Sequence, residues 1–195
     1  MISAVVLAAG QSKRMGRPKI NLPWGKTTVL GAILSALQEG GVDKIAVVTG
    51  PISIVGLDPR IESKIQFVPN PLAEISEMLV SLQFGLKALC EDVSAALITL
   101  GDQPQLQSQT VAGLLSLYQQ NKAPIIVPSY KLHRGHPWLI QRNLWAEILE
   151  LPSSATLRQF LDNHKGSIYY HVVDTESVLM DLDTPEDYMQ NIPGV

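Results

Sequence analysis

The sequence predicts an α/β fold with a mainly parallel central sheet flanked by helices. Strand-like and helix-like segments alternate along the chain, which is typical of this fold class. Candidate strands such as Ile2–Leu7 and Ala95–Leu100 are almost wholly apolar, as strands buried on both faces must be. Hydrophobic residues make up 46% of the 195 residues, enough for one sizeable core. We therefore expect a single domain over residues 1–195.

The first half of the chain supplies three strands and two helices. A helix is expected at Val29–Leu37, where apolar residues recur at helical spacing, and Gly40 ends it. Between Gly50 and Pro59, two prolines and two glycines predict a loop with at most a short helical turn. A second helix follows a cap at Ser76. The expected strands are Ile2–Leu7, Lys44–Thr49 and Ile65–Val68.

The second half continues the alternation. Ser108 is expected to cap a helix, and His136–Ile140 reads as extended. Met180–Tyr188 is expected to pass from a strand end into a last helix, with Thr184 as its cap and Pro185 in its first position. The remaining expected strands are Ala95–Leu100, Pro124–Val127 and Ile168–Val173, and the remaining expected helices are Asn143–Leu149 and Ala155–Asp162.

Charge and cysteine content narrow the function classes. Fifteen Lys and Arg against eighteen Asp and Glu give a net charge of −3, so no basic surface for nucleic acid is expected. The single cysteine, Cys90, excludes an internal disulfide framework and a zinc site of several cysteines, and it is expected to pack in the core beside Leu86. No basic leader and no apolar run of roughly 20 residues is present, so we expect a cytoplasmic protein without a membrane partner.

The loop that follows the first strand has the residue types of a phosphate-binding loop. Its small residues let backbone N–H groups approach phosphate oxygens closely. Arg14 and Lys19 would add fixed positive charge, one as a planar fork and one as a point charge. The segment therefore suits a nucleoside triphosphate. Its small residues are Ala8, Ala9, Gly10 and Gly16.

This loop matches neither of the two commonest phosphate-binding motifs. Walker A requires Gly-Lys-Ser/Thr after its second glycine, whereas Gly16 is followed by Arg17 and Pro18. The dinucleotide fingerprint Gly-x-Gly-x-x-Gly fails directly after Gly10, which makes a nicotinamide oxidoreductase the least favoured class. An ordinary glycine-rich turn is the alternative reading of the loop on its own.

Two aspartates are candidate metal ligands. Asp102 follows an apolar strand, at the sheet edge where open α/β folds bind ligands, so it is either a turn residue or a ligand for Mg²⁺. Asp183 and Asp181 alternate on an extended segment and project to one face, although a plain strand-to-helix junction explains them equally well.

One histidine has an unusual setting. His136 lies between Gly135 and Pro137, so it either contacts an acceptor substrate or belongs to a structural turn. No nucleophilic side chain is needed if the nucleophile belongs to the substrate, because a phosphate acceptor that attacks the α-phosphate of a triphosphate is already anionic at neutral pH. Alignment and charge neutralisation then suffice for transfer to it.

Four motifs together resemble the MobA-like nucleotidyltransferases, and most closely their molybdenum cofactor cytidylyltransferase branch. They span nearly the whole chain in the right order. The motifs are Leu7-Ala8-Ala9-Gly10 with Ser12, Arg14, Met15, Gly16 and Lys19; Gly101-Asp102-Gln103-Pro104; Arg134-Gly135-His136-Pro137; and Asp181-Leu182-Asp183-Thr184-Pro185-Glu186-Asp187-Tyr188.

The resemblance implies a Rossmann-like domain that joins a nucleoside monophosphate to a phosphorylated acceptor and releases pyrophosphate. It implies CTP as donor, a molybdopterin-type acceptor, Mg²⁺ as cofactor and a molybdoenzyme as a further partner. The catalytic residues would be Arg14, Lys19 and Asp102, and the metal ligands would be Asp102 and Asp183. The substrate-binding residues would be Leu7, Ala8, Ala9, Gly10, Arg14, Lys19, Asn70, Ser81, Asp102 and His136.

One segment departs from the pattern of that branch. After Asn70-Pro71 the branch has Gly-Met-Ser-Ser-Ser-Leu, whereas this chain has Glu77-Met78-Leu79-Val80-Ser81-Leu82, with fewer polar groups to contact the base. Two alternatives therefore stay open. One is a nucleotidyltransferase with another triphosphate or a sugar-phosphate acceptor. The other is a non-catalytic maturation protein that binds nucleotide or cofactor.

Overall fold

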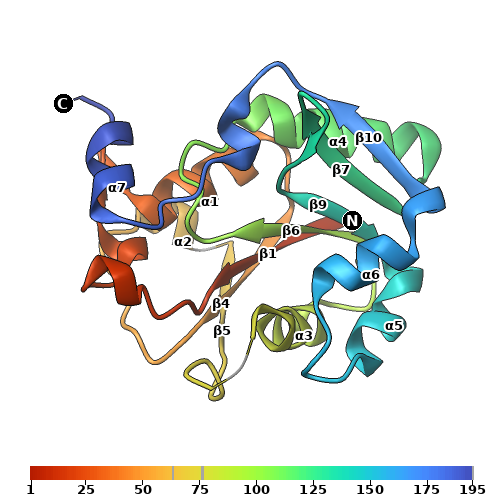
Figure 1. Cartoon of the computed structure of the whole chain (residues 1–195), viewed down its shortest axis with the longest axis horizontal. Coiled ribbons are helices and arrows are strands. Elements are labelled where there is room, and N and C mark those ends of the chain that lie inside the picture. The colour runs from red at the N-terminus through yellow and green to blue at the C-terminus, as the bar shows by residue number, and fades with distance from the viewer. Residues whose placement is uncertain (63, 76, 195) are drawn as a thin grey trace.

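A computed structural model describes residues 1–62, 64–75 and 77–194. Its main sheet has eight strands in the order β10-β7-β9-β6-β1-β4-β5, with β8 paired to β7 (Figure 1). The strands are β1 (Ile2–Ala8), β4 (Lys44–Thr49), β5 (Ile65–Pro69), β6 (Ala95–Leu100), β7 (Ile125–Tyr130), β8 (His133–Arg134), β9 (Trp138–Gln141) and β10 (Ile168–Val172). A separate hairpin pairs β2 (Pro23–Trp24) with β3 (Thr27–Thr28).

The core of the sheet is parallel, which confirms the expected fold class. β1 lies between β4 and β6 and runs parallel to both. β5 pairs in parallel with β4, and β10 pairs in parallel with β7. β9 is the exception, because it pairs antiparallel with both β6 and β7. β6 and β7 therefore run in the same direction, and their carboxyl ends lie at the same edge of the sheet as the end of β1.

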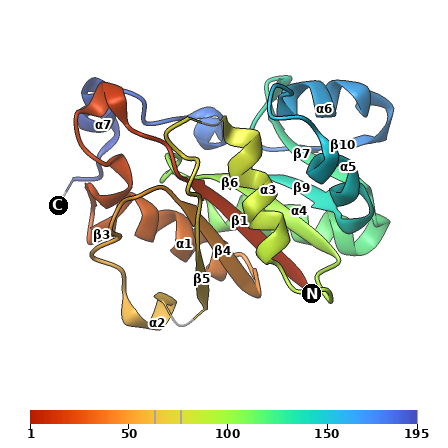
Figure 2. The ribbon, with the colours of Figure 1, turned by 90° about the horizontal axis from the view of Figure 1, so that it is seen from below.

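Helices cover both faces of this sheet. Alternate residues of β1 divide between two cores: Val6 packs with α1 and α4, and Val5 packs with α3, α5 and α6. Figure 2 shows α3 crossing β1 on one of these faces. The helices are α1 (Val29–Glu39), α2 (Pro59–Glu62), α3 (Met78–Ala88), α4 (Ser108–Asn121), α5 (Trp145–Glu150), α6 (Leu157–Asn163) and α7 (Pro185–Asn191). The 3-10 turns are η1 (Lys13–Met15), η2 (Lys19–Asn21), η3 (Arg142–Leu144), η4 (Lys165–Ser167) and η5 (Glu176–Leu179).

The predicted cap of the last helix is confirmed. The Thr184 side chain accepts a hydrogen bond from the Asp187 backbone, the Asp187 carboxylate accepts one from the Thr184 backbone, and Pro185 begins the helix. These bonds hold the pKa of Asp187 below its usual range. The result is a fixed start to α7, directly after Asp183.

Several local predictions were wrong. Cys90 is exposed, because α3 ends at Ala88 and the thiol no longer follows its apolar face. Gln107, and not Ser108, occupies the cap position of α4. The segment that carries Asp181 and Asp183 is extended but pairs with no strand among the described residues. The predicted cap at Ser76 lies outside the described residues.

Within the described chain, every helix is too short or too polar to cross a membrane.

Candidate active site

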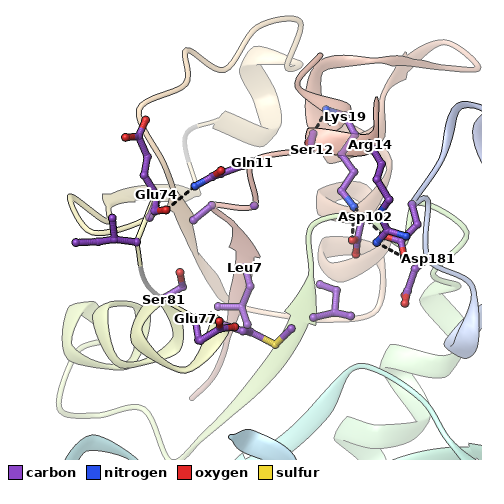
Figure 3. Close-up of a pocket in the computed structure, with 17 residues that line it drawn as sticks. Leu7, Gln11, Ser12, Arg14, Lys19, Glu74, Glu77, Ser81, Asp102 and Asp181 are labelled. Carbon is purple, nitrogen blue, oxygen red and sulfur yellow. Dashed lines mark hydrogen bonds and ion pairs between the residues drawn. The ribbon is translucent and has the colours of Figure 1, made fainter. Parts of the chain in front are cut away.

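A cleft of about 650 Å³ opens at the carboxyl ends of β1 and β6. Leu7 and Leu100, from the two strands, line it. Figure 3 shows two groups of side chains on opposite sides of Leu7. The charged side carries Ser12, Arg14, Lys19, Asp102 and Asp181, together with Asp183, which is ion-paired to Arg14 and Lys19. The other side carries Gln11, Glu74, Glu77 and Ser81. The cleft is also lined by Ala9, Gly10, Ala73, Ile75 and Met78.

The loop after β1 turns back on itself and carries its cations to the charged side. Ser12 and Gly16 both adopt left-handed backbone conformations, with φ of 49° and 66°. The Ser12 hydroxyl accepts a hydrogen bond from the Lys19 backbone at 3.2 Å, and the Ser12 carbonyl accepts one from Met15 at 2.9 Å. The loop is therefore anchored at both ends of the turn that presents Arg14.

The two cations are paired with carboxylates. Lys19 Nζ lies 2.6 Å from Asp102 Oδ2 and 3.5 Å from Asp183 Oδ1, and it donates to the Leu182 carbonyl at 3.0 Å. Arg14 lies 3.0 Å from Asp183. Only 13% of the Lys19 side chain is exposed, against 67% for Arg14, so the lysine pair is the less screened by solvent.

A backbone hydrogen bond fixes the position of residues 181–183, which bring Asp181 and Asp183 to the cleft. The Leu182 N–H donates to the Asp102 carbonyl at 2.9 Å, and the Leu182 side chain is fully buried, so its neighbours face the cleft. Asp181 accepts a hydrogen bond from Gln103 at 2.7 Å. Desolvation, together with the nearby Asp102 carboxylate, raises the pKa of Asp181 above its usual range. The three carboxylates on this side of the cleft therefore outnumber its two cations, Lys19 and Arg14.

These carboxylates fit a divalent cation. Asp102 Oδ1 is buried and has no hydrogen-bond partner among the described residues. In the same part of the chain, no three His, Cys, Asp or Glu side chains already surround one point. Mg²⁺ is usually held by one or two carboxylates, with water and substrate phosphates completing its shell, so a three-carboxylate cage is not required.

The other side of the cleft has fewer charges and one fixed polar group. The Ser81 hydroxyl accepts a hydrogen bond at 3.0 Å from the buried Asn70 amide. Gln11 donates to the Glu74 carbonyl at 2.8 Å, which ties the loop after β1 to the segment before α3. Since the cations lie opposite, this side could hold an uncharged part of a ligand.

The structure brings most of the predicted site residues into one cleft, but not all of them. Ala8 is buried in the core, Asn70 lies behind Ser81, and neither they nor His136 line the cleft. Those that line it are Leu7, Ala9, Gly10, Arg14, Lys19, Ser81, Asp102 and Asp183.

His136 has the environment of a structural residue. Its ring stacks on Trp138 with centroids 4.4 Å apart, and its backbone N–H donates to the Val178 carbonyl at 2.9 Å. Desolvation by burial lowers the pKa of His136 to about 4. Of the two interpretations that the sequence left open, these contacts favour the structural one.

Acid is expected to destabilise the fold through His136. Between pH 6.5 and 4 the unfolded chain binds a proton at this residue and the folded chain does not. The unfolding free energy should therefore fall over this window by up to about 3 kcal/mol. Urea unfolding at pH 7 and pH 4 would measure the fall. His136→Gln removes the titrating ring and should show a smaller decrease, whereas equal decreases would contradict the assignment.

Sequence reasoning missed Gln11 and Gln103, which position other site residues. Each makes a contact across a large sequence separation, to the Glu74 backbone and to Asp181. A lone glutamine carries no pattern that predicts such a partner. The one available signal was the position of Gln103 directly after Asp102, which indicated that Gln103 lies near the site.

Comparison with known proteins agrees with this geometry. Residues 4–168 match the model of the MobA-like NTP transferase domain family. The chain is 29% identical over 191 residues to the molybdenum cofactor cytidylyltransferase of Escherichia coli K12, covering 96% of this chain and 94% of that protein. It is also 27% identical over 197 residues to the nicotine blue oxidoreductase of Paenarthrobacter nicotinovorans, covering 95% and 93%.

A solved structure shares the whole fold. Rv0371c of Mycobacterium tuberculosis H37Rv superposes with a TM-score of 0.81 at 27% identity, and the match covers 100% of both chains. The same protein has been solved in complex with manganese, with a TM-score of 0.75 at 26% identity and coverage of 100% and 99%. With a cleft that carries the expected loop and carboxylates, and with a family match over most of its length, the chain belongs to the MobA-like NTP transferase domain family and is a nucleotidyltransferase.

Proposed function

We propose that this protein transfers CMP from CTP to a molybdopterin-type acceptor and releases pyrophosphate, with Mg²⁺ as cofactor. The observation that carries the proposal is the meeting of Arg14 and Lys19 with Asp102 and Asp183 on one side of the cleft. The molybdenum cofactor cytidylyltransferase of Escherichia coli supports the donor and the acceptor. Residues 1–195 would act as one domain, in the cytoplasm, with a molybdoenzyme as client.

The reaction needs alignment and charge neutralisation. An acceptor phosphate oxygen attacks the α-phosphorus, the bond from that phosphorus to the bridging oxygen breaks, and pyrophosphate leaves with the electron pair. Lys19, held by Asp102 and the Leu182 carbonyl, is positioned to stabilise the charge that develops on the phosphates. Arg14 is more exposed and would hold the outer phosphates.

Asp102 and Asp183 would hold the divalent cation. Such an ion, when bound, neutralises phosphate oxygens and orients them. Substrate binding would extend this network. Lys19 and Arg14 would donate to phosphate oxygens as well as to the carboxylates, and the free oxygen of Asp102 would bind the metal. The unpartnered Asp102 Oδ1 supports this assignment.

Pyrophosphate release in the presence of molybdopterin, CTP and Mg²⁺ is the direct test. We expect release to require all three components, and CTP to be preferred over GTP, UTP and ATP in both turnover and thermal stabilisation. Equal stabilisation by all four nucleotides would contradict CTP as the donor. Stabilisation without release would indicate the non-catalytic maturation protein, and release with a sugar phosphate would redirect the acceptor.

One relative favours a second candidate function. The nicotine blue oxidoreductase matches over nearly the whole chain, so an oxidation–reduction reaction on this fold is a specific alternative. The loop after β1 lacks the dinucleotide fingerprint, which argues against a nicotinamide cofactor. Oxidation of NADH or NADPH by the purified protein would support the alternative and overturn the transferase proposal.

A further inference from the structure

A second groove lies beside α6. It encloses about 650 Å³, and none of its lining residues lines the cleft described above. β8, the start of β9, α6, η4 and η5 all contribute to it. The lining residues that matter here are Arg134, Trp138, Arg158, Leu161, Lys165 and Leu179.

The rim of this groove carries excess positive charge. Arg134 and Lys165 both approach the single carboxylate of Asp162, at 3.4 and 3.5 Å. Arg158 is exposed, and within the described chain it makes no hydrogen bond or ion pair. The lining of the groove therefore has three guanidinium and ammonium groups and one carboxylate, in a chain whose net charge is −3. Such a surface attracts an anion.

The groove is also preorganised. Arg134 Nε donates to the Tyr170 hydroxyl at 2.9 Å, which fixes the guanidinium beside the opening. The Trp138 indole forms part of an apolar floor with Leu161 and Leu179, and its N–H donates to the Gly135 carbonyl at 2.8 Å. An apolar floor under a cationic rim suits an organic anion better than a small inorganic ion.

The groove adjoins the cleft at one short segment. Leu179 lines the groove and Asp181 lines the cleft, so only Met180 lies between the two linings along this part of the chain. Gly135 packs closely against the chain next to this segment, where a Cβ would collide with the Val178 carbonyl. An acceptor bound across both sites would lie beside residues 179–181.

We propose that this groove binds the part of the acceptor substrate that lies away from the reacting phosphate, and that this part is an organic anion. The inference rests on the proposed function, since it assigns the acceptor of the same reaction. Arg158 supplies the free charge, Arg134 and Lys165 flank it, and the apolar floor contacts the body of the acceptor.

Reversal of one rim charge tests the assignment. Arg158→Glu should raise the KM for molybdopterin by about ten- to a hundredfold, the usual effect of losing a charge-assisted contact. The KM for CTP and kcat should stay unchanged, because Arg158 lies outside the cleft. Lys87→Glu, an exposed change of equal charge on α3 and outside both sites, should leave all three constants unchanged.

Binding titrations separate this inference from the proposed function. Isothermal titration with molybdopterin in the absence of nucleotide should show weaker binding to Arg158→Glu than to wild type. If wild type binds molybdopterin but releases no pyrophosphate, the proposed function fails. The groove assignment still stands in that case, provided that Arg158→Glu binds molybdopterin more weakly than wild type does. Equal affinities for the two proteins, equal KM values, or no binding by wild type would overturn the groove assignment.

Discussion

Asp102→Asn is expected to lower kcat for pyrophosphate release by at least about a hundredfold. Asp102 holds Lys19 at 2.6 Å, and its other oxygen, buried and unpartnered, is the position proposed for a divalent cation. The amide removes the negative charge, and a bound cation contributes several kcal/mol of charge stabilisation in the transition state. Initial rates measured over a range of Mg²⁺ concentrations would show both a lower kcat and a weaker metal requirement.

The matched control for this change is Asp92→Asn. Asp92 is exposed and lies outside the cleft, so its loss should leave the rate unchanged. Thermal unfolding and near-UV circular dichroism would establish that the Asp102→Asn protein is folded. Activity near the wild-type level in that folded variant would remove Asp102 from the metal site.

Lys19→Met should abolish most of the transfer while preserving the shape of the side chain. The ammonium group bonds to Asp102 and to the Leu182 carbonyl, so it links the loop after β1 to the segments that carry these two residues. Its side chain is also less exposed than that of Arg14, the other cation of the cleft. Loss of a preorganised donor to developing charge usually lowers kcat by about 10²–10³-fold. Steady-state kinetics with the donor nucleotide varied would separate this loss from weaker nucleotide binding.

Lys26→Met serves as the control, since Lys26 is exposed and lies outside the cleft. The unfolding free energy of Lys19→Met should also fall, because Asp102 then lacks its cation. If Lys19→Met retained kcat and only the KM for the nucleotide rose, Lys19 would be a binding residue without a role in the transition state.

The sequence predicted the parallel part of the sheet well because burial on both faces leaves a strong signal. β1, β4 and β6 are nearly continuous apolar runs. The direction of β9 could not be read in this way, since the same apolar pattern fits a parallel or an antiparallel neighbour. The hairpin of β2 and β3 has two residues in each strand, too few for any periodicity to appear.

The structure brings the predicted residues together where residue chemistry and sheet topology agree. Asp102 and Lys19 meet because the ends of β1 and β6 share an edge, which the α/β pattern already implies. His136 and Cys90 were harder to place. The His136 ring could face a ligand or stack on Trp138, and the Cys90 thiol could enter the core or point to solvent. In each case the outcome depends on a turn of one or two residues, which hydrophobic periodicity does not resolve.

The bonds of Lys19 to Asp102 and to Leu182 span 83 and 163 residues of sequence. During synthesis the ribosome releases every strand of the sheet before it releases Asp183, so the charged side of the cleft is completed late. A nucleotide whose binding requires the charged side of the cleft would stabilise only chains that have been synthesised beyond Asp183. Products cut short before it would lack this protection, and proteases that act on the unfolded population would remove them selectively.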